Sequence, residues 1–395
     1  MIRIKDFAVI SSEKKCITVL QRAEIAPLKT HQQASKNTRN KEYIAKIETE
    51  HPKQEMMQRA VVFFVIASIL LAGCIETTKT SPLAPLGDAD NDGLPNGWEE
   101  EQGLDPFNGS DAPKCMGLVQ YCLRTYDNFT FAETHNSFAT TEDGVYYPAS
   151  NHDTGLSAQW NGGVRAFMLD THHRSDSENN PEDVVFCHGD NDGIINPCSY
   201  SEVDAFAWLS QLRSFMDDNP NQVVTILLEN YVPSNHLEFL FNETGLLEKT
   251  YVHQIAEPWP TLGEMVLSNK TLVVYWDESD ELEYPWLHHA WTHSWDTPYG
   301  EGNEDEMSCD VGRGDINQPV WHLNNWLSNS LGLSDPQRSE DVNGYDKLLQ
   351  RTIDCWEEVG NRPTFIAVDW WENGDVVGVI ETINQMETWN STAES

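Results

Sequence analysis

Positive charge is scarce in this sequence. Of its 395 residues, 25 are Lys or Arg and 63 are Asp or Glu, which gives a formal net charge of −38. Binding to nucleic acid requires clustered Lys and Arg that replace counterions at the phosphates, so the composition argues against a nucleic-acid partner. The same deficit disfavours long-range attraction to anionic membranes.

The sequence also lacks an apolar run of the roughly 20 residues that a transmembrane helix needs. Its apolar stretch Ala60 to Leu71 follows Arg59 and runs into a Leu-Ala-Gly-Cys motif that ends at Cys74. This order is typical of a lipoprotein signal peptide, which is cleaved before a lipid-modified cysteine. The alternative, a buried core helix with an incidental cysteine, does not explain the motif.

We therefore predict a lipoprotein signal peptide over residues 56–73 and a Thr/Pro-rich tether over 74–87, with Cys74 anchored in a membrane. Translation would then start at Met56 or Met57, and residues 1–55 would be a mis-called upstream extension. That segment has more basic than acidic residues, whereas the rest of the chain is strongly acidic. The predicted location is extracytoplasmic, at a cell surface.

No CxxC spacing occurs, so a zinc site has no support from the sequence. Six cysteines remain beyond Cys16 and the anchor, and an even number after an export signal indicates disulfides. Sequence alone permits many pairings. We predict Cys115–Cys122 and Cys187–Cys198 as short loops, which leaves Cys309–Cys355.

Acidic residues are concentrated in the stretch DADNDGLPNGWE, within residues 88–111. Gly93 stands at position 6 of this twelve-residue loop, where a calcium loop needs a sharp turn. Oxygen ligands would come from positions 1, 3, 5, 9 and 12, which are Asp88, Asp90, Asp92, Asn96 and Glu99. The pattern resembles the calcium loops of thrombospondin type 3 and dockerin-like repeats, and it predicts bound Ca²⁺.

Residues 112–395 alternate apolar strand-like segments with amphipathic helical ones, such as 345–359. Within residues 201–220 the apolar spacing is helical, and Ser201 with Asp204 predicts a capping box. Near-continuous apolar strands separated by helices indicate parallel strands covered by helices. The length favours an α/β fold of the (β/α)₈ or TIM-barrel type over an open sheet.

Polar residues follow four of the predicted strands. They are His135 with Asn136, then Asp170, His188 and Glu229. In a barrel the carboxyl ends of the strands meet on one face, where active sites are built. Each residue alone could be a cap or a structural side chain, but four such strand ends together predict a site.

These strand ends carry a family resemblance. The segments THNS, NGGVRAFMLDTHH, FCHG, PNQVVTILLENYV, PWPTLGEMV and PTFIAVDWWENGDVV resemble the phosphatidylinositol-specific phospholipase C X-domain, in order from about residue 126 to 388. The likeness is to its PLC-like phosphodiesterase branch. It implies a distorted TIM barrel that cleaves a phosphodiester of phospholipid type.

The resemblance also implies roles for single residues. His135 would be the general base that activates the inositol 2-hydroxyl, and His188 the general acid that protonates the departing glyceride oxygen. Apart from the resemblance, Asp369 at the end of the last apolar strand is a candidate to orient His135, with a helix cap as the alternative. The first product would be a cyclic phosphate.

In the calcium-dependent branch of that family, the resemblance makes Asn136, Asp170 and Glu229 ligands of Ca²⁺. Met168 stands where those enzymes have a further carboxylate, so one ligand is missing unless water or His172 substitutes. The candidate substrate-binding residues are Arg165, Trp276 and Trp371, although Arg165 lies on the strand face opposite to Asp170.

Two other functions remain open. The first is a glycerophosphodiesterase or a sphingomyelinase D-like phosphodiesterase on a similar barrel. The second is a non-catalytic, calcium-dependent surface protein that keeps the barrel as a binding scaffold. Met168 and the scarcity of cations favour the second, whereas the retained histidines oppose it.

Overall fold

The computed structural model describes residues 84–174, 179–188, 198, 201–330 and 332–391, and the backbone of two further strands. These two strands, β1 (Arg3–Ser11) and β2 (Ile17–Glu24), form an antiparallel pair in a separate unit of the chain. The predicted signal peptide and residues 74–83 of the tether lie outside the described residues. No helix in the described part of the chain is both long and apolar enough to cross a membrane.

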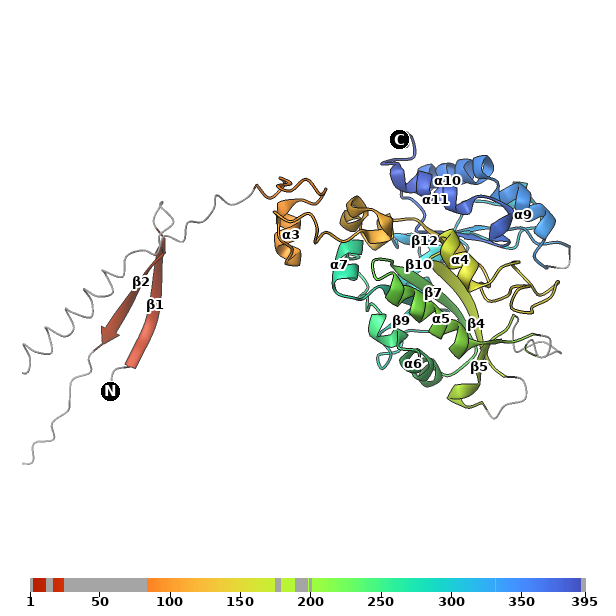
Figure 1. The fold of residues 1–395 in the computed structure, drawn as a ribbon, viewed down its shortest axis with the longest axis horizontal. Helices are drawn as coiled ribbons and strands as arrows, with labels where there is room; N and C mark the ends of the chain where they lie inside the picture. Colours follow the sequence, from red (N-terminus) through yellow and green to blue (C-terminus); the bar gives the residue numbers. More distant parts are fainter. Residues whose placement is uncertain are drawn as a thin grey trace, which may run out of the picture. The chain divides into compact units, whose positions relative to one another are not determined.

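Eight parallel strands form the centre of the second unit (Figure 1). In spatial order they are β9 (Leu287–His289), β8 (Leu272–Trp276), β7 (Val224–Asn230), β4 (Ala166–His173), β3 (Phe131–Thr134), β13 (Phe365–Val368), β12 (Val320–Asn325) and β10 (Ser294–Asp296). Each strand except the outermost pairs in parallel with both neighbours. This is the chain order of a (β/α)₈ barrel.

The barrel is incomplete at one seam. Among the described strands no pairing joins β9 to β10. The four-residue helix α8 (Ala290–His293) connects them directly, whereas a parallel pair needs a crossover of a dozen or more residues. The prediction of a distorted TIM-barrel-like fold is therefore confirmed, and the short connection explains the distortion.

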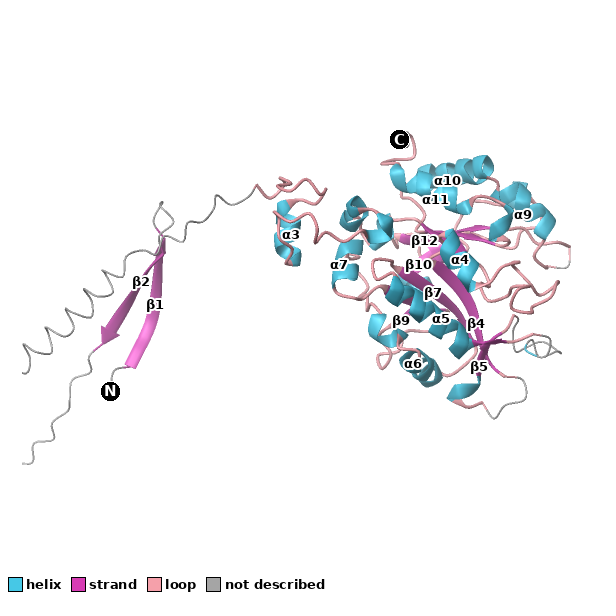
Figure 2. Cartoon of the chain, in the orientation of Figure 1, coloured by secondary structure: helices cyan, strands magenta, loops and turns pink. Residues whose placement is uncertain are grey.

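Helices cover the outside of the sheet. They are α4 (Leu156–Gly162), α5 (Ala205–Asp218), α6 (Ser234–Glu243), α7 (Leu262–Leu267), α9 (Pro336–Asn343), α10 (Tyr345–Val359) and α11 (Val376–Gln385), and α3 (Asn96–Gln102) precedes the first barrel strand. Figure 2 shows α4 and α5 against β4 and β7. The rings of Phe167 in β4 and Trp208 in α5 pack edge to face, with their centroids 5.5 Å apart. This contact is an example of the packing between the sheet and its outer helices.

Strand alternation divides the core into two clusters, as period-2 side chains require. Phe167 and Leu169 of β4 belong to the outer cluster under the helices. Ala166 and Met168 belong to the inner cluster, which fills the barrel. The predicted face of Ala166, Met168 and Asp170 is therefore the one that points inward.

One predicted barrel strand is wrong. The segment before His188, predicted as the third barrel strand, contains β5 (Val184–Phe186), which pairs antiparallel with the C-terminal part of β4. Strand β6 (Val203–Asp204) pairs antiparallel with β5. They form a short extension beyond the barrel, because β4 continues past its barrel partners to His173. A second small addition, β11 (Arg313–Gly314), pairs antiparallel with β10.

The three predicted disulfides are confirmed. They join Cys115 to Cys122, Cys187 to Cys198, and Cys309 to Cys355. The second one holds the residue that directly precedes His188.

Candidate active site

His135 follows the last residue of β3 at the carboxyl end of the barrel. The next residue, Asn136, has a positive φ of 50°, a conformation that Asn tolerates better than most residues, and it turns the chain across the strand ends. The backbone N–H of His135 donates to Val368 O of β13, and that of Ser137 donates to Met168 O of β4. This turn therefore lies over three neighbouring strands, which fixes both side chains.

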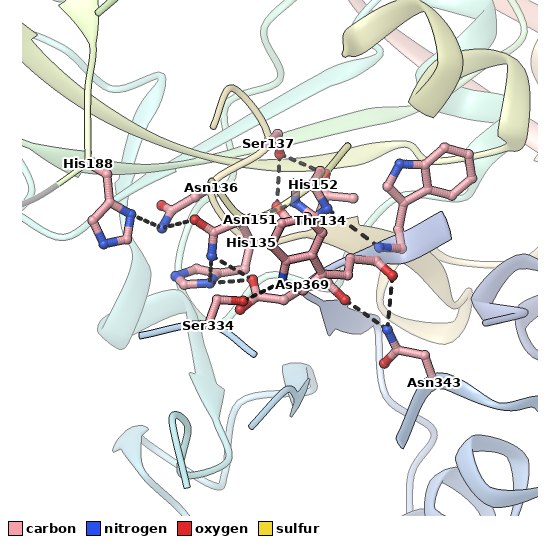
Figure 3. A network of polar contacts seen from close by, with 12 residues as sticks. Thr134, His135, Asn136, Ser137, Asn151, His152, His188, Ser334, Asn343 and Asp369 are labelled. Atoms are coloured by element: carbon pink, nitrogen blue, oxygen red, sulfur yellow. Dashed lines mark hydrogen bonds and ion pairs between the residues drawn. The ribbon is translucent and has the colours of Figure 1, made fainter. Parts of the chain in front are cut away.

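The His135 ring is held from two sides. Its Nδ1 lies 2.9 Å from Oδ1 of the buried Asp369, and Trp326 stacks on the ring with centroids 4.3 Å apart. Asn151 donates to the same Asp369 oxygen at 2.9 Å, as Figure 3 shows. Because a carboxylate can only accept, Nδ1 carries the proton and Nε2 is left as a base. The predicted contact between His135 and Asp369 is present.

His188 has the opposite arrangement. The Nδ2 amide of Asn136 lies 2.6 Å from Nδ1 of His188 (Figure 3). An amide NH₂ donates, so Nδ1 accepts and the proton of the neutral ring is on Nε2. The sequence did not predict this contact, because it assigned Asn136 to a metal.

Burial and charge tune the protonation of the pair. Desolvation of the ring, and then the like charge of His135, lower the pKa of His188. Burial alone would raise the pKa of Asp369, but the charge and hydrogen bond of His135 outweigh it and lower that pKa. Asp369 is therefore a permanent negative charge behind His135.

Two adjoining hollows open at these residues and share His135, Asn136, Asp170 and Glu229 in their walls. The outer hollow has a volume of about 370 Å³ and includes His188. The inner hollow has about 70 Å³ and reaches Met168 and the barrel interior. The structure thus brings all five predicted strand-end residues to one place, although β5 is not a barrel strand.

The predicted metal ligands line the inner hollow together. Asp170 and Glu229 are direct neighbours in the β4–β7 register, and Tyr231 donates to Glu229 at 2.5 Å. Asp277, which the sequence did not single out, adds a third carboxylate to the wall of this hollow. Burial and the charge of Glu229 raise the pKa of Asp277 to about 6, although a backbone hydrogen bond from Asn230 acts in the opposite direction. Hard oxygen donors and negative charge are the kind of ligands that Ca²⁺ binds, although Met168 supplies no ligand and the three carboxylates do not form one of the tight ligand groups of the described residues.

The three predicted substrate-binding residues lie elsewhere. Arg165 donates to Gln222 and to two backbone carbonyls beside a separate hollow at the start of β4, and burial lowers its pKa to about 10. Trp276 is buried in the outer cluster, and Trp371 packs on Gly162 of α4. The direction of β4 explains why Arg165 is far from the site. Arg165 directly precedes β4, whereas the site lies at the carboxyl end of that strand. None of the three lines the hollows at His135 and His188.

The side chains that do line the inner hollow include an arginine that the sequence reasoning missed. Arg313 of β11 lies between Trp291 and Tyr299, with its Cζ 4.0 and 4.5 Å from the ring centroids. It donates from Nε and Nη2 to the buried Asp296 at 3.0 and 2.6 Å. In the sequence, Arg313 lies in a Gly- and Asp-rich stretch that has neither a strand-like apolar pattern nor a known motif, so sequence reasoning did not identify it.

The predicted calcium loop lies apart from this site, before the barrel. Oxygen atoms of Asp88, Asp90 and Asp92 lie within 4.8 Å of one another. Asn96 is directed elsewhere: its Oδ1 accepts from Ala89 N and its Nδ2 donates to Ala84 O. Its assignment as a ligand is therefore wrong.

Glu99, the last predicted ligand of this loop, is fully buried. Burial, followed by the charges of Asp92 and Asp90, raises its pKa to about 7. The carboxylate therefore faces the acidic loop, as the spacing predicted.

Comparison with known families identifies one that matches most of the barrel. The family described as PI-PLC X 1 matches residues 121–384, about two thirds of the chain, which include every strand-end residue discussed above. The chain belongs to the PI-PLC X family. The predicted calcium loop lies outside the part of this PI-PLC X protein that matches.

Relatives of this PI-PLC X protein include two from the fungus Arthroderma benhamiae. An uncharacterized secreted protein is 25% identical over 67% of the chain, and a PI-PLC X domain-containing protein is 24% identical over 68%. A PI-PLC X domain-containing protein of Arabidopsis thaliana is 26% identical over 66%. The matched region spans 62%, 89% and 62% of these three relatives, respectively.

Among solved structures, a mutant of the phosphatidylinositol-specific phospholipase C from Staphylococcus aureus is similar, with a TM-score of 0.47 and 12% sequence identity. The comparison covers 67% of this chain and 94% of the bacterial one.

Proposed function

We propose that this protein is a phosphodiesterase that acts on phosphatidylinositol or a related phosphodiester. The observation that carries the proposal is the pair His135 and His188, which border one hollow and face different partners at Nδ1, a carboxylate and an amide. One ring presents a base at Nε2 and the other a proton at Nε2. Phosphodiester cleavage needs both functions, one to accept and one to donate a proton.

In the first step, His135 Nε2 takes the proton from a substrate hydroxyl next to the phosphate, which in phosphatidylinositol is the inositol 2-hydroxyl. The hydroxyl oxygen attacks phosphorus and forms a cyclic phosphate. Asp369 stabilises the imidazolium that results, because its charge lies 2.9 Å from Nδ1.

In the same step the bond from phosphorus to the glyceride oxygen breaks, and a protonated His188 donates its Nε2 proton to that oxygen. The negative phosphodiester offsets the low pKa of His188, because an adjacent anion favours the charged ring. Asn136 serves both forms of His188, since a half-turn of its amide presents oxygen to Nδ1–H in place of NH₂.

Asp170 and Glu229 would hold Ca²⁺ in the inner hollow, and Asn136 would add its oxygen while its NH₂ group faces a neutral His188. A Ca²⁺ ion there would acidify the attacking hydroxyl and offset negative charge on the phosphate. Arg313 would supply the fixed positive charge of this hollow. Its rigid position between two aromatic rings suits it to a phosphate or hydroxyl oxygen.

We also propose that the protein is exported and anchored by a lipid at Cys74. Three disulfides are typical of an oxidising compartment, and one relative is described as secreted. The anchor rests on the sequence motif alone. Mass spectrometry of the N-terminus of protein from its native membrane would detect the lipid-modified cysteine.

The test of the catalytic proposal is turnover of phosphatidylinositol vesicles by the full chain, with products followed by phosphorus NMR in CaCl₂ or EGTA. We expect a cyclic inositol phosphate that depends on Ca²⁺. His135→Ala and His188→Ala should each lower kcat by about 100-fold to 10,000-fold without changing the melting temperature. His236→Ala, in the separate His173–His236 pair, is the matched control.

Retention of activity in either catalytic variant would refute the roles given to the two histidines. Cleavage that yields a non-cyclic phosphate would point to the glycerophosphodiesterase or sphingomyelinase D-like alternative. Absence of any product, while the protein still binds the vesicles through the hollow, would favour the binding scaffold.

A further inference from the structure

A chain of side-chain hydrogen bonds joins the two histidines of the site. From His135 it runs to Asp369, then through the amides of Asn151 and Asn136 to His188, as Figure 3 shows. The distances between the bonded atoms are 2.9, 2.9, 3.4 and 2.6 Å in that order. Asn151, in the middle of the chain, is only 2% exposed and lies in the loop between β3 and α4, where sequence reasoning did not single it out.

This chain has a fixed polarity, because its members differ in what they can donate. A carboxylate only accepts, so the NH₂ group of Asn151 must face Oδ1 of Asp369. The oxygen of the same amide then faces Asn136 and accepts from its NH₂ group. That orientation of Asn136 also presents its NH₂ group to Nδ1 of His188, which must accept. Asp369 therefore sets the role of a ring that lies two amides away from it.

The backbone around Asn151 holds this amide in place. The N–H of Asn151 donates to Ala139 O at 2.7 Å, and its carbonyl accepts from Trp370 N at 2.7 Å. The next residue, His152, is fully buried, and its Nε2 lies 2.7 Å from His135 O. The loop is thus bonded both to the segment that follows β3 and to the segment that follows β13.

We propose that Asn151 is a positioning residue, which passes the orientation imposed by Asp369 on to Asn136. As a result, Nδ1 of His188 accepts and Nε2 of the resting ring carries the proton. This inference rests on the proposed function, in which the two rings act as base and acid. The half-turn of Asn136 that serves a charged His188 breaks the bond to Asn151, the longest of the chain at 3.4 Å. Asn151 restores the resting orientation of Asn136 when His188 is neutral again.

The test is ¹⁵N NMR of the full chain with ¹⁵N-labelled histidine, in EGTA at about pH 8, where histidine rings are neutral. The chemical shifts of the ring nitrogens show which one carries the proton, and His135→Gln and His188→Gln assign the signals. In the wild type we expect Nδ1–H for His135 and Nε2–H for His188. In Asn151→Leu we expect a mixture of tautomers for His188 alone, because His135 keeps its direct contact with Asp369.

Asn384→Leu is the matched control. Asn384 is also 2% exposed, and its amide bonds to both backbone groups of Thr130, directly before β3, at 2.9 and 2.8 Å. The same substitution there removes two buried hydrogen bonds at the end of the strand opposite to His135. It should therefore lower the melting temperature and leave the tautomers of both rings as in the wild type.

Turnover of phosphatidylinositol vesicles gives a second measurement. Asn151→Leu should lower kcat about tenfold to a hundredfold, because the acid is held in one tautomer only part of the time. Its KM should change by less than about twofold, since the variant loses orientation of reacting groups and not binding. Asn384→Leu should keep the wild-type kcat at 25 °C.

Three results would overturn the inference: a neutral His188 protonated at Nδ1 in the wild type, an unchanged His188 tautomer in Asn151→Leu, or the same change in Asn384→Leu. The first is measured on the wild type, so it decides even if Asn151→Leu does not fold. Absence of turnover by the wild type would refute the proposed function instead, while the NMR result would still support or overturn the chain of hydrogen bonds.

Discussion

The two histidines differ because their neighbours differ. An acidic acceptor faces Nδ1 of His135 and an amide donor faces Nδ1 of His188. The group that hydrogen-bonds to one ring nitrogen of a histidine sets which nitrogen carries the proton, and therefore whether the other nitrogen can accept or donate a proton. A histidine at the end of a strand is common, whereas two rings that present opposite functions to one hollow are a specific arrangement.

The mutual effect of the rings can be measured directly. His135 lowers the pKa of His188 by like charge, so His135→Gln should raise that pKa toward the ordinary histidine value of about 6.5. In this variant no histidine ring faces Asp369, so the negative charge of Asp369 also raises the pKa of His188. Two-dimensional NMR of the His188 ring across pH 4 to 8 would show the shift, with His236→Gln as the control. An unchanged or lower pKa would contradict the arrangement.

At the scale of elements, helix α5 shows how tertiary contacts correct a local pattern. The predicted capping box with Ser201 does not form; the helix begins at Ala205, and Asp204 caps it by accepting from Ala207 N. Phe206 is exposed, whereas Trp208 is buried against Phe167. The periodicity identified the helix, but the sheet beneath it decided which face is buried.

The two longer disulfide loops allow a matched experiment on elements. Cys187–Cys198 holds the residue next to His188, so Cys187→Ser with Cys198→Ser should lower kcat. Cys309–Cys355 closes a loop of 46 residues, so its removal should lower the free energy of unfolding more, by about 4 kcal/mol against about 3 kcal/mol. Its effect on kcat at 25 °C should be small. Turnover and urea unfolding of both double variants would check this; equal loss of kcat in the two would contradict it.

At the scale of the whole molecule, the net charge of −38 opposes a membrane of anionic lipid. We therefore expect turnover on phosphatidylinositol vesicles to rise between about 10 mM and 150 mM NaCl, as the Debye length falls from about 30 Å to about 8 Å. A soluble monomeric phosphodiester in the same buffers is the control. If turnover falls with salt, a basic surface must draw the protein to the vesicle.

The sequence alone determined the barrel type of the fold and the meeting of the strand-end residues, whereas it permitted many cysteine pairings, among which the structure selects one. The first two follow from the alternation of strands and helices and from the rule that parallel strands end on one face. His135, Asn136, Asp170 and Glu229 were predictable because each lies in or just after the carboxyl-terminal part of its own strand.

Only the tertiary structure decided which side chains surround them. Arg313, Asp277 and Trp326 reach the hollow from loops and strand ends that carry no motif. Arg165 lies away from the site because it precedes β4, at the opposite end of the barrel, and the polar atoms of Asn96 bond to Ala89 N and Ala84 O. Spacing along a chain fixes the direction of a side chain within one element, but partners are set by packing between elements.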